Sequence, residues 1–410
     1  MTRKPSYRFV GHTEPWEEKK LGEVTSDLKS GLSRMLANED IGLPVIRANN
    51  INDGYLDLSN DIKYWYEVDP QGSNTNNYVV EENDILINFI NSEAKMGTSA
   101  IVRFPLDRKT IYTTNILRLR VSEGISSNFI FYIFSISRYI NFIKSITKPA
   151  VNQSSFTTVD FKKFIIFLPS LPEQTAIGSF FQDIDQLISL QQRKLEVLKE
   201  QKKTYLKLLF PAKGQTKPAL RFAGFEDEWK EVKLGEVCSI KGGNAWKSKH
   251  YSTDGKYLVV TISNVKGNEY IDDTYGNRID TVENQFILEQ GDILISLTGN
   301  VGRVSKMTEV AAVLNQRVGK LTTNQSNNFL FTLLSNRNFE NEMVLSSQGA
   351  AQANISNTDV LNYKTSFPSL PEQEVIGSFF QDLDKAIAKQ EEKVNQLKES
   401  KQTLLRKMFI

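Results

Sequence analysis

One feature limits the fold of this chain more than any other: the same long segment occurs in it twice. Residues 169–210 and 368–409 align without a gap, and 24 of their 42 positions are identical. Self-similarity of this kind indicates a duplicated structural unit. The chain therefore contains two copies of one architecture, and each copy ends in the repeated segment.

The two copies also begin alike, whereas their middle regions differ. The matching beginnings are Lys4-Pro5, Arg8-Phe9, Trp16 and Leu21–Val24 in the first copy, and Lys217-Pro218, Arg221-Phe222, Trp229 and Leu234–Val237 in the second. The weaker matches between them are Asn50 with Asn264, 83–86 with 291–294, Asn115 with Asn315, and 128–131 with 328–331. This contrast suggests that the repeated segments share one task, while the middle regions have two different tasks.

The middle regions are predicted to be mixed α/β domains built from many short strands. The strand-like segments, separated by Gly, Asn and Asp clusters, are 43–46, 84–87, 100–102, 116–121, 257–262, 292–297 and 320–322. A chain of 410 residues usually forms more than one core. We predict an α+β protein with domains at 1–168 and 213–367, and repeated spacer helices at 169–212 and 368–410.

The repeated segments are predicted to be long helices. Each opens with Pro-Glu-Gln, in which the proline suits the first turn and the acid favours the helix dipole. The apolar heptad positions are Ile177, Phe181, Ile184, Ile188, Leu195, Leu198, Tyr205 and Leu209, and Ile376, Phe380, Leu383, Ile387, Val394, Leu397, Leu404 and Met408. The polar interruptions are Gln191 and Lys202, and Gln390 and Lys401. A period of about 3.5 residues predicts a coiled-coil seam, and polar seam residues fix its register. We expect the two helices to pair antiparallel; the alternative is that each helix only covers the core of its own domain.

Composition excludes several classes of protein. One cysteine, Cys238, cannot form an internal disulfide, and with two histidines a zinc site is not expected. The N-terminus lacks the apolar core of a signal peptide, and the apolar stretch 129–143 is too interrupted to span a membrane. These features fit a cytoplasmic protein without metal or cofactor. The net charge of +2 neither favours nor excludes nucleic-acid binding.

The duplicated order of these motifs resembles the specificity subunits of Type I restriction–modification systems. The residues that carry the resemblance are the two Pro-Ser-Leu-Pro-Glu-Gln motifs at 169–174 and 368–373, Trp229 before 234–237, the Gly-Asp-Ile-Leu of 291–294, and 349–355. The first copy departs from this pattern at 148–154. The resemblance covers nearly the whole chain.

This resemblance implies a function and a set of partners. Each domain would be a target-recognition domain that reads one half of a split, gapped target in double-stranded DNA. The helical spacer would set the gap, because a fixed distance between two readers makes half-site spacing a geometric requirement. Two methyltransferase subunits would dock on the chain and modify adenines, and motor-nuclease subunits would join them.

Catalytic motifs are missing from the sequence. It has neither the Asn/Asp-Pro-Pro-aromatic motif of an amino-methyltransferase nor a phosphate-binding loop. Asp84 followed by Glu93 and Lys95 imitates a nuclease site, but the second copy lacks it, and a turn before a strand explains Asp84 better. We expect a non-catalytic, DNA-reading subunit. The alternatives are a stand-alone nuclease or methyltransferase, and a coiled-coil scaffold that never contacts DNA.

Candidate DNA contacts were chosen by side-chain chemistry and position. Base edges are read by Arg, Lys, Asn and Gln, and phosphates by cations and hydroxyls. The candidates, which lie in polar loops beside expected strands, are Arg47, Asn49, Asn50, Lys95, Thr98, Lys148, Asn152 and Gln153 in the first domain, and Ser263, Asn264, Lys266, Arg303, Gln348, Gln352 and Asn354 in the second. The aromatic residues 64–66 and those within 129–134 are expected to be core residues rather than base-stacking ones.

Overall fold

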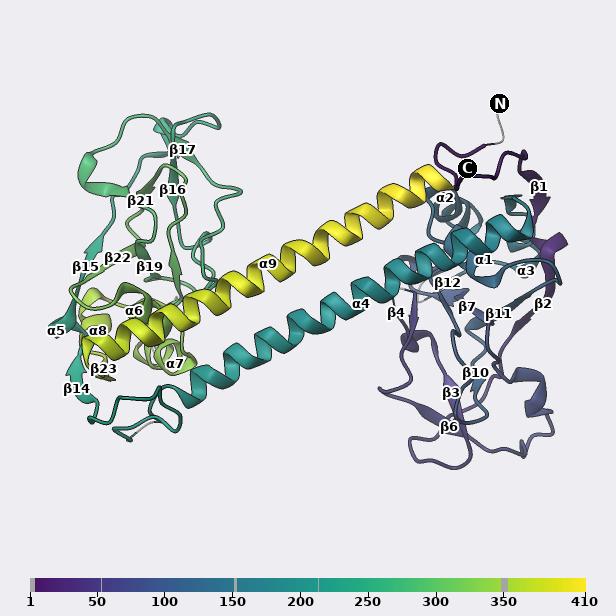
Figure 1. Ribbon diagram of the computed structural model, residues 1–410, viewed down its shortest axis with the longest axis horizontal. Helices are drawn as coiled ribbons and strands as arrows, with labels where there is room; N and C mark the ends of the chain where they lie inside the picture. The colour runs from purple at the N-terminus through teal and green to yellow at the C-terminus, as the bar shows by residue number, and fades with distance from the viewer. Residues whose placement is uncertain (1–3, 53, 151–152, 213, 348–352) are drawn as a thin grey trace. The chain divides into compact units, whose positions relative to one another are not determined.

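The computed structural model of the protein describes residues 4–52, 54–150, 153–212, 214–347 and 353–410. The chain forms two compact units, which are described separately. Unit 1 contains residues 1–191 and 393–410, and unit 2 contains residues 192–392. Each unit therefore combines one of the mixed α/β domains with the first part of one long helix and the last part of the other (Figure 1).

Unit 1 is organised around a four-stranded antiparallel sheet in the order β2-β11-β7-β9. Its strands are β2 (Thr25–Ser30), β11 (Ile116–Val121), β7 (Ile85–Asn88) and β9 (Ser99–Ile101). A three-stranded sheet contains β10 (Ile111–Tyr112), β3 (Leu43–Ile46) and β6 (Lys63–Trp65). Three strand pairs complete the unit: β1 (Glu17–Lys20) with β13 (Ile165–Leu168), β4 (Ile51–Asn52) with β5 (Tyr55–Leu56), and β8 (Ile90–Asn91) with β12 (Ser154–Ser155).

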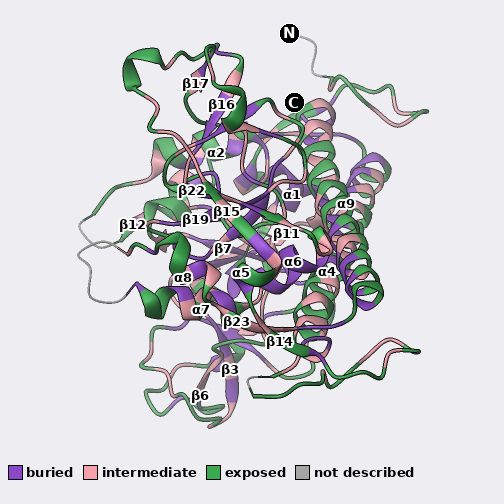
Figure 2. Cartoon of the chain, turned by 90° about the vertical axis from the view of Figure 1, so that its left-hand side faces the viewer, coloured by how far each residue is buried: buried purple, intermediate pink, exposed green. Residues whose placement is uncertain are grey.

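Short helices cover one face of the four-stranded sheet of unit 1. They are α1 (Ser127–Ile133), α2 (Ser137–Ile146) and α3 (Thr158–Phe161). Phe129, Phe131, Tyr132 and Phe134 are buried with the sheet residues Ile85, Ile87 and Leu117 in one core. Figure 2 colours the buried residues of the chain purple. The expectation that this apolar stretch belongs to the core is confirmed. Trp65 is buried as well, whereas Tyr66 is 45% exposed and therefore does not belong to the core.

Unit 2 repeats this plan with two four-stranded sheets. The first has the order β15-β22-β19-β20, with β15 (Cys238–Gly242), β22 (Val318–Thr323), β19 (Ile293–Ser296) and β20 (Val304–Lys306). The second has the order β17-β16-β21-β18, with β17 (Arg278–Ile279), β16 (Tyr257–Val260), β21 (Ala312–Leu314) and β18 (Ile287–Leu288). The remaining elements are the pair β14 (Lys230–Lys233) with β23 (Lys364–Phe367), and the helices α5 (Leu234–Val237), α6 (Asn327–Leu334), α7 (Arg337–Ser346) and α8 (Asn357–Leu361). Every strand-like segment expected from the sequence lies in a strand to within two residues.

The repeated segments form the long helices α4 (Leu171–Leu208) and α9 (Leu370–Met408). Within the described residues, neither these helices nor the shorter ones are both long and apolar enough to cross a membrane. All the apolar heptad positions named above are buried or half-buried, as a seam requires. The seam face predicted from the heptads is therefore the covered face of both helices.

Hydrogen bonds of the Pro-Glu-Gln motif connect the start of each long helix to the domain of the same copy. In unit 1 the buried Glu173 carboxylate accepts two hydrogen bonds from Arg8, at 2.8 and 2.6 Å, and in unit 2 Glu372 accepts two from Arg221, both at 2.7 Å. The adjacent glutamine, Gln174 or Gln373, accepts a hydrogen bond from the first residue before α1 or α6. The arginine that begins each copy is thus the hydrogen-bond partner of the glutamate in the Pro-Glu-Gln motif of the same copy.

Each long helix starts in one unit and ends in the other. The C-terminal end of α9 packs in the core of unit 1, and the C-terminal end of α4 packs in the core of unit 2. In unit 1, Phe409 packs against Phe129 and Phe181, with ring centroids 5.2 and 5.8 Å apart. In unit 2, Phe210 packs against Phe329 and Phe380 at 5.6 and 6.1 Å. A helix that only covered its own domain would not make these contacts, so that alternative does not describe this fold.

Candidate nucleic-acid interface

A buried asparagine supports the first candidate loop in each unit. The Asn50 side chain accepts the Arg47 backbone N–H at 2.9 Å and donates to the carbonyls of Asp57 and Asn60 at 3.0 and 3.1 Å. Asn264 makes the same three bonds in unit 2, to Thr261, Asp272 and Tyr275. Both side chains are 1% exposed or less, and their bonds point inward. Both asparagines therefore stabilise the shape of the loop and do not face solvent. The sequence predicts that they face the base edges of DNA, which this buried position does not allow.

The exposed residues of this first loop carry its polar chemistry. In unit 1, Arg47 and Asn49 both donate to the Asp61 carboxylate, at 2.5 and 2.9 Å, and these bonds to Arg47 lower the pKa of Asp61. In unit 2, Lys266 donates to Asp272 at 2.7 Å and holds the pKa of that carboxyl at about 2. Ser263 is exposed beside it. Each loop therefore presents a cation that is already oriented by an acid on the same loop.

A second loop in each unit comes from equivalent places in the sheet. In unit 1 the loop after β7 carries Lys95, which is exposed, and Thr98, whose hydroxyl accepts from Asn88 at 2.9 Å and donates to the Lys95 carbonyl at 2.8 Å. In unit 2 the loop after β19 carries Arg303, which donates to Glu340 at 3.0 Å and is about 39% exposed. Thr98 therefore shapes its loop, while Lys95 and Arg303 remain accessible.

Each of these second loops contains a glycine, and any other residue at that position would force neighbouring atoms to move. Gly97 and Gly302 have positive φ values of 73° and 80°. A Cβ atom at Gly97 would lie 2.8 Å from the Ile143 side chain, and one at Gly302 would lie 2.7 Å from Met343. The two loops are thus the same structural feature with different side chains.

A third segment contributes the remaining candidates. Lys148 and Gln153 are exposed next to the strand pair β8–β12, and the Asn354 amide oxygen accepts from the Thr298 hydroxyl at 3.1 Å. Thr298 and Asn354 also form a β-bridge, as β8 and β12 do in unit 1. Asn152, Gln348 and Gln352 lie outside the described residues.

Several candidates of unit 1 line one shallow hollow. Arg47, Asn49 and Lys95 are joined there by residues that are not among the candidate DNA contacts, namely Leu32, Ser33, Arg34, Ala48, Asn52, Asn91, Thr113, Thr114 and Asn115. Arg34 is held by Asp69, which accepts from it at 3.1 and 2.5 Å, and this contact lowers the pKa of Asp69 far below its usual range. The sequence signal for this segment is a glycine in each copy. Gly31 lies against the backbone of the turn that follows β10, and Gly243 lies in the same way against the turn that follows β21.

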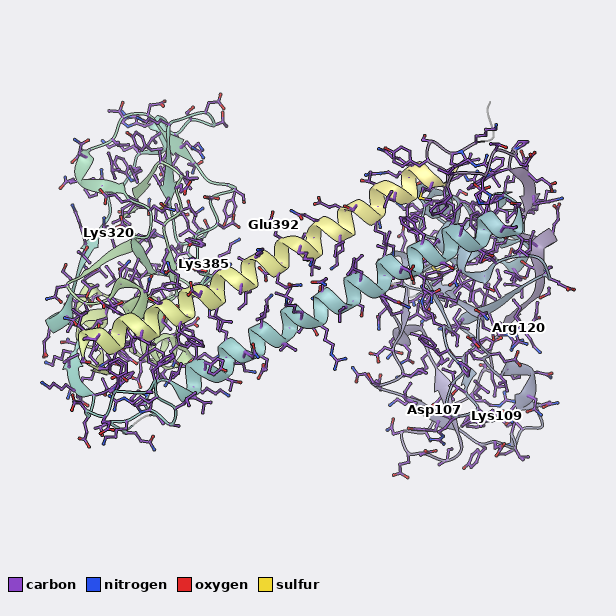
Figure 3. All side chains as sticks on the ribbon, in the orientation of Figure 1. Asp107, Lys109, Arg120, Lys320, Lys385 and Glu392 are labelled. Carbon is purple, nitrogen blue, oxygen red and sulfur yellow. The ribbon has the colours of Figure 1, made fainter. Side chains whose placement is uncertain are left out.

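The acid-rich pattern at Asp84 is structural. Its carboxylate accepts the Glu81 backbone N–H at 2.8 Å and pairs with Arg120 at 2.7 Å. Asp292 does the same in unit 2 with Glu289 and Lys320; Figure 3 labels Arg120 on β11 and Lys320 on β22. The expectation of a turn before a strand is confirmed. Within the part of the chain that the structure describes, no three His, Cys, Asp or Glu side chains are grouped to hold a metal ion.

The two units thus present different exposed side chains on matching frames. The model of the Type I restriction modification DNA specificity domain matches the chain twice, at residues 13–200 and 226–399. The chain belongs to this family. The relationship expected from the duplicated motifs is confirmed.

Known members of the specificity-domain family are similar along nearly the whole chain. The Type I restriction enzyme MjaVIII specificity subunit of Methanocaldococcus jannaschii is 25% identical over 422 aligned residues, which cover 96% of this chain and 91% of that protein. The crystal structure of the Type I restriction–modification system S subunit from M. genitalium has a TM-score of 0.65 at 16% identity and covers 99% of both chains. A chain from work on complex assembly and conformational transition of the type I R-M system has a TM-score of 0.53 at 19% identity, covering 98% of this chain and 99% of that one. These two structural likenesses concern the fold.

Proposed function

We propose that this protein is the DNA-sequence specificity subunit of a Type I restriction–modification complex, in which each recognition domain reads one half of a bipartite, gapped DNA target. One observation carries the proposal: two copies of the specificity domain share a buried frame and differ in the exposed residues of equivalent loops. Different readers on the same frame are what two unlike half-sites require.

The proposed DNA contacts are the members of the candidate set that are exposed or, for the two arginines, half-buried. They are Arg47, Asn49, Lys95, Lys148 and Gln153 in the first domain, and Ser263, Lys266, Arg303 and Asn354 in the second. Asn50, Asn264 and Thr98 are proposed to act on DNA only through the loops that they shape. Asn152, Gln348 and Gln352 remain predictions from the sequence.

Replacing Arg47 or Arg303 by alanine is expected to relax base choice in one half-site only. A bidentate contact to a base edge contributes about 1–3 kcal/mol of discrimination, and each arginine lies in a different domain. Binding of the reconstituted methyltransferase complex would be measured on duplexes that carry single-base changes in either half-site. Lys163→Ala, which removes an exposed cation outside these loops, is the control. An even loss of affinity across all sequences would instead identify a phosphate contact.

We also propose that the helices at 169–212 and 368–410 form an antiparallel coiled coil that spaces the two domains and docks two methyltransferase subunits. Its polar seam residues support a fixed register, since Lys401 pairs with Asp185 within unit 1 and Lys202 with Asp384 within unit 2, both at 2.5 Å. The proposed complex also takes up motor-nuclease subunits, which add cleavage, while this chain is non-catalytic and needs no cofactor.

Disulfide trapping tests the direction of the helices. Cysteines replacing Ile184 and Leu404, which both pack against the unit 1 core, are expected to crosslink under mild oxidation. The pair Ile184 and Leu383, which would be neighbours in a parallel arrangement, is expected not to crosslink. The reverse result would contradict the antiparallel coiled coil.

A genome-wide map of methyladenine, with and without this gene, tests the function itself. Deletion is expected to abolish methylation at one split, gapped motif and to leave other methylation unchanged. If no motif is lost, a gel shift with the reconstituted methyltransferase complex decides between a silent system and a chain that does not read DNA. Absence of any shift would contradict the proposal.

A further inference from the structure

A single aspartate in unit 1 joins both long helices to the recognition domain. One oxygen of the Asp185 carboxylate on α4 accepts from Lys401 on α9 at 2.5 Å, and the other accepts from the Tyr132 hydroxyl on α1 at 2.7 Å. Arg103, which follows β9, lies 3.6 Å from the same carboxylate. These side chains are largely buried, so their mutual contacts are weakly screened by water.

The backbone of the same aspartate contacts the first candidate reading loop. The Tyr55 hydroxyl, on strand β5, donates to the Asp185 carbonyl at 3.2 Å. In Figure 1 the pair of strands to which β5 belongs lies beside α4. A direct connection therefore runs from the helix surface to the loop that carries Arg47 and Asn49.

That loop is closed on itself, so its two ends move together. Asn50 bonds the loop at Arg47, Asp57 and Asn60, and Asp61 holds Arg47 and Asn49. Because these bonds link the start of the loop to its end, we expect a shift at Tyr55 to reach the side chains of Arg47 and Asn49.

The tip of the loop is fixed at a second point. Gly54 has a φ of 89°, and a Cβ atom there would lie 3.2 Å from the ring of Phe131 on α1. Phe131 in turn lies under the Arg103 guanidinium, whose carbon is 5.5 Å from the ring centroid. Gly54 also forms a β-bridge with Ala100, so the tip is held beside β9 and close to α1, and Tyr55 is the residue that reaches α4.

Both tyrosines remain hydrogen-bond donors at neutral pH. Burial, followed by the negative charge of Asp185, raises the pKa of Tyr55 and of Tyr132 above the usual value for tyrosine. The two hydroxyls therefore keep their protons at neutral pH and can donate them to Asp185.

We propose that Asp185 and Tyr55 are positioning residues for base reading: they hold the Arg47–Asn49 loop in a fixed place on the paired helices. This inference rests on the proposed function. Neither residue touches DNA; each acts through the loop. A loop held in this way meets the base edges in one geometry, whereas a loosened loop accepts neighbouring bases as well.

In unit 2 the equivalent aspartate also pairs with a lysine, but the side chains around this pair differ from those in unit 1. Asp384 pairs with Lys202, and Lys306 replaces Arg103, donating to Asn328 at 3.1 Å. The carboxylate of Glu269 lies 4.0 Å from the Lys306 ammonium in this cluster. Since this second cluster shares no residue with the first, changes at Tyr55 or Asp185 should leave the half-site read by the second domain unaffected.

The test uses the full chain reconstituted with its methyltransferase subunits, and duplexes that carry the mapped target with one base changed in either half-site. Tyr55→Phe keeps the ring and removes only the bond to α4, and Asp185→Asn removes the charge. We expect discrimination against wrong bases to fall about threefold for Tyr55→Phe and about tenfold for Asp185→Asn, in one half-site only. Asp183→Asn, an exposed aspartate two residues earlier on the same helix, is the matched control and should match the wild type.

This readout separates positioning from stability, because a poorly folded chain loses methylation on every duplex without changing its base preference. Unchanged discrimination in Tyr55→Phe, or equal losses in both half-sites, would overturn the inference. A wild-type complex that shows no preference in either half-site would instead overturn the proposed function. Should Asp185→Asn fail to fold, Tyr55→Phe alone decides, since Tyr55 is 44% exposed and keeps its ring packing.

Discussion

Replacing Phe409 by alanine is expected to destabilise unit 1 by about 3–5 kcal/mol, the usual cost of removing a buried phenylalanine ring. Phe409 is 7% exposed, and its ring packs among Trp16, Phe129 and Phe181. The second-last residue of the chain is thus part of a core whose other aromatic residues lie more than 200 positions earlier. Hydrogen exchange should show lost protection in β7 and β11 and unchanged protection in β19 and β22.

The equivalent substitution in the second copy is the control for Phe409→Ala. Phe210→Ala removes the equivalent ring, which packs among Trp229, Phe329 and Phe380, and should affect β19 and β22 while sparing β7 and β11. If Phe409→Ala lowered protection equally in all four strands, or in none of them, then its contacts would not stabilise unit 1 as described.

Replacing Glu372 by glutamine is expected to lower the stability of unit 2 by about 2 kcal/mol. The side chain is 1% exposed and accepts two hydrogen bonds from Arg221, and the substitution leaves the arginine without its counter-charge. Breaking a buried pair often costs more, but Arg221 remains partly accessible to water, which limits the loss. Denaturant unfolding of the full chain measures the change.

Glu374→Gln is the matched control for this substitution. Glu374 is exposed on the same helix, two residues further on, so neutralising it should change stability by less than about 0.5 kcal/mol. Equal effects of the two variants would mean that helix charge, and not the Arg221 contact, governs the stability of this junction.

Much of the architecture could be predicted because it is recorded in local patterns. The duplicated segment predicted two copies, the Pro-Glu-Gln motif predicted the start of each long helix, and short apolar runs predicted the strands. Each of these signals involves residues close together in the chain, where spacing alone determines which side chains share a face.

The candidate interface was harder to predict, because the same residue type can serve two purposes. Asparagine can read adenine, and it can also satisfy the backbone of a tight loop. Asn50 and Asn264 do the second, with both side chains buried, while Asn49 next to one of them is exposed. Sequence chemistry pointed to these loops but did not distinguish the residues that shape them from those that face outward.

By itself, then, the sequence determined the duplication, the two long helices with their covered apolar face, and the family to which the chain belongs. The tertiary structure alone decided which unit receives the end of each helix, and that Asp185 links the helices to the Tyr55 loop. The reason is physical: Phe409 and Lys401 meet partners more than two hundred residues away in the chain, and such contacts depend on how complete surfaces fit together. No local spacing records that fit.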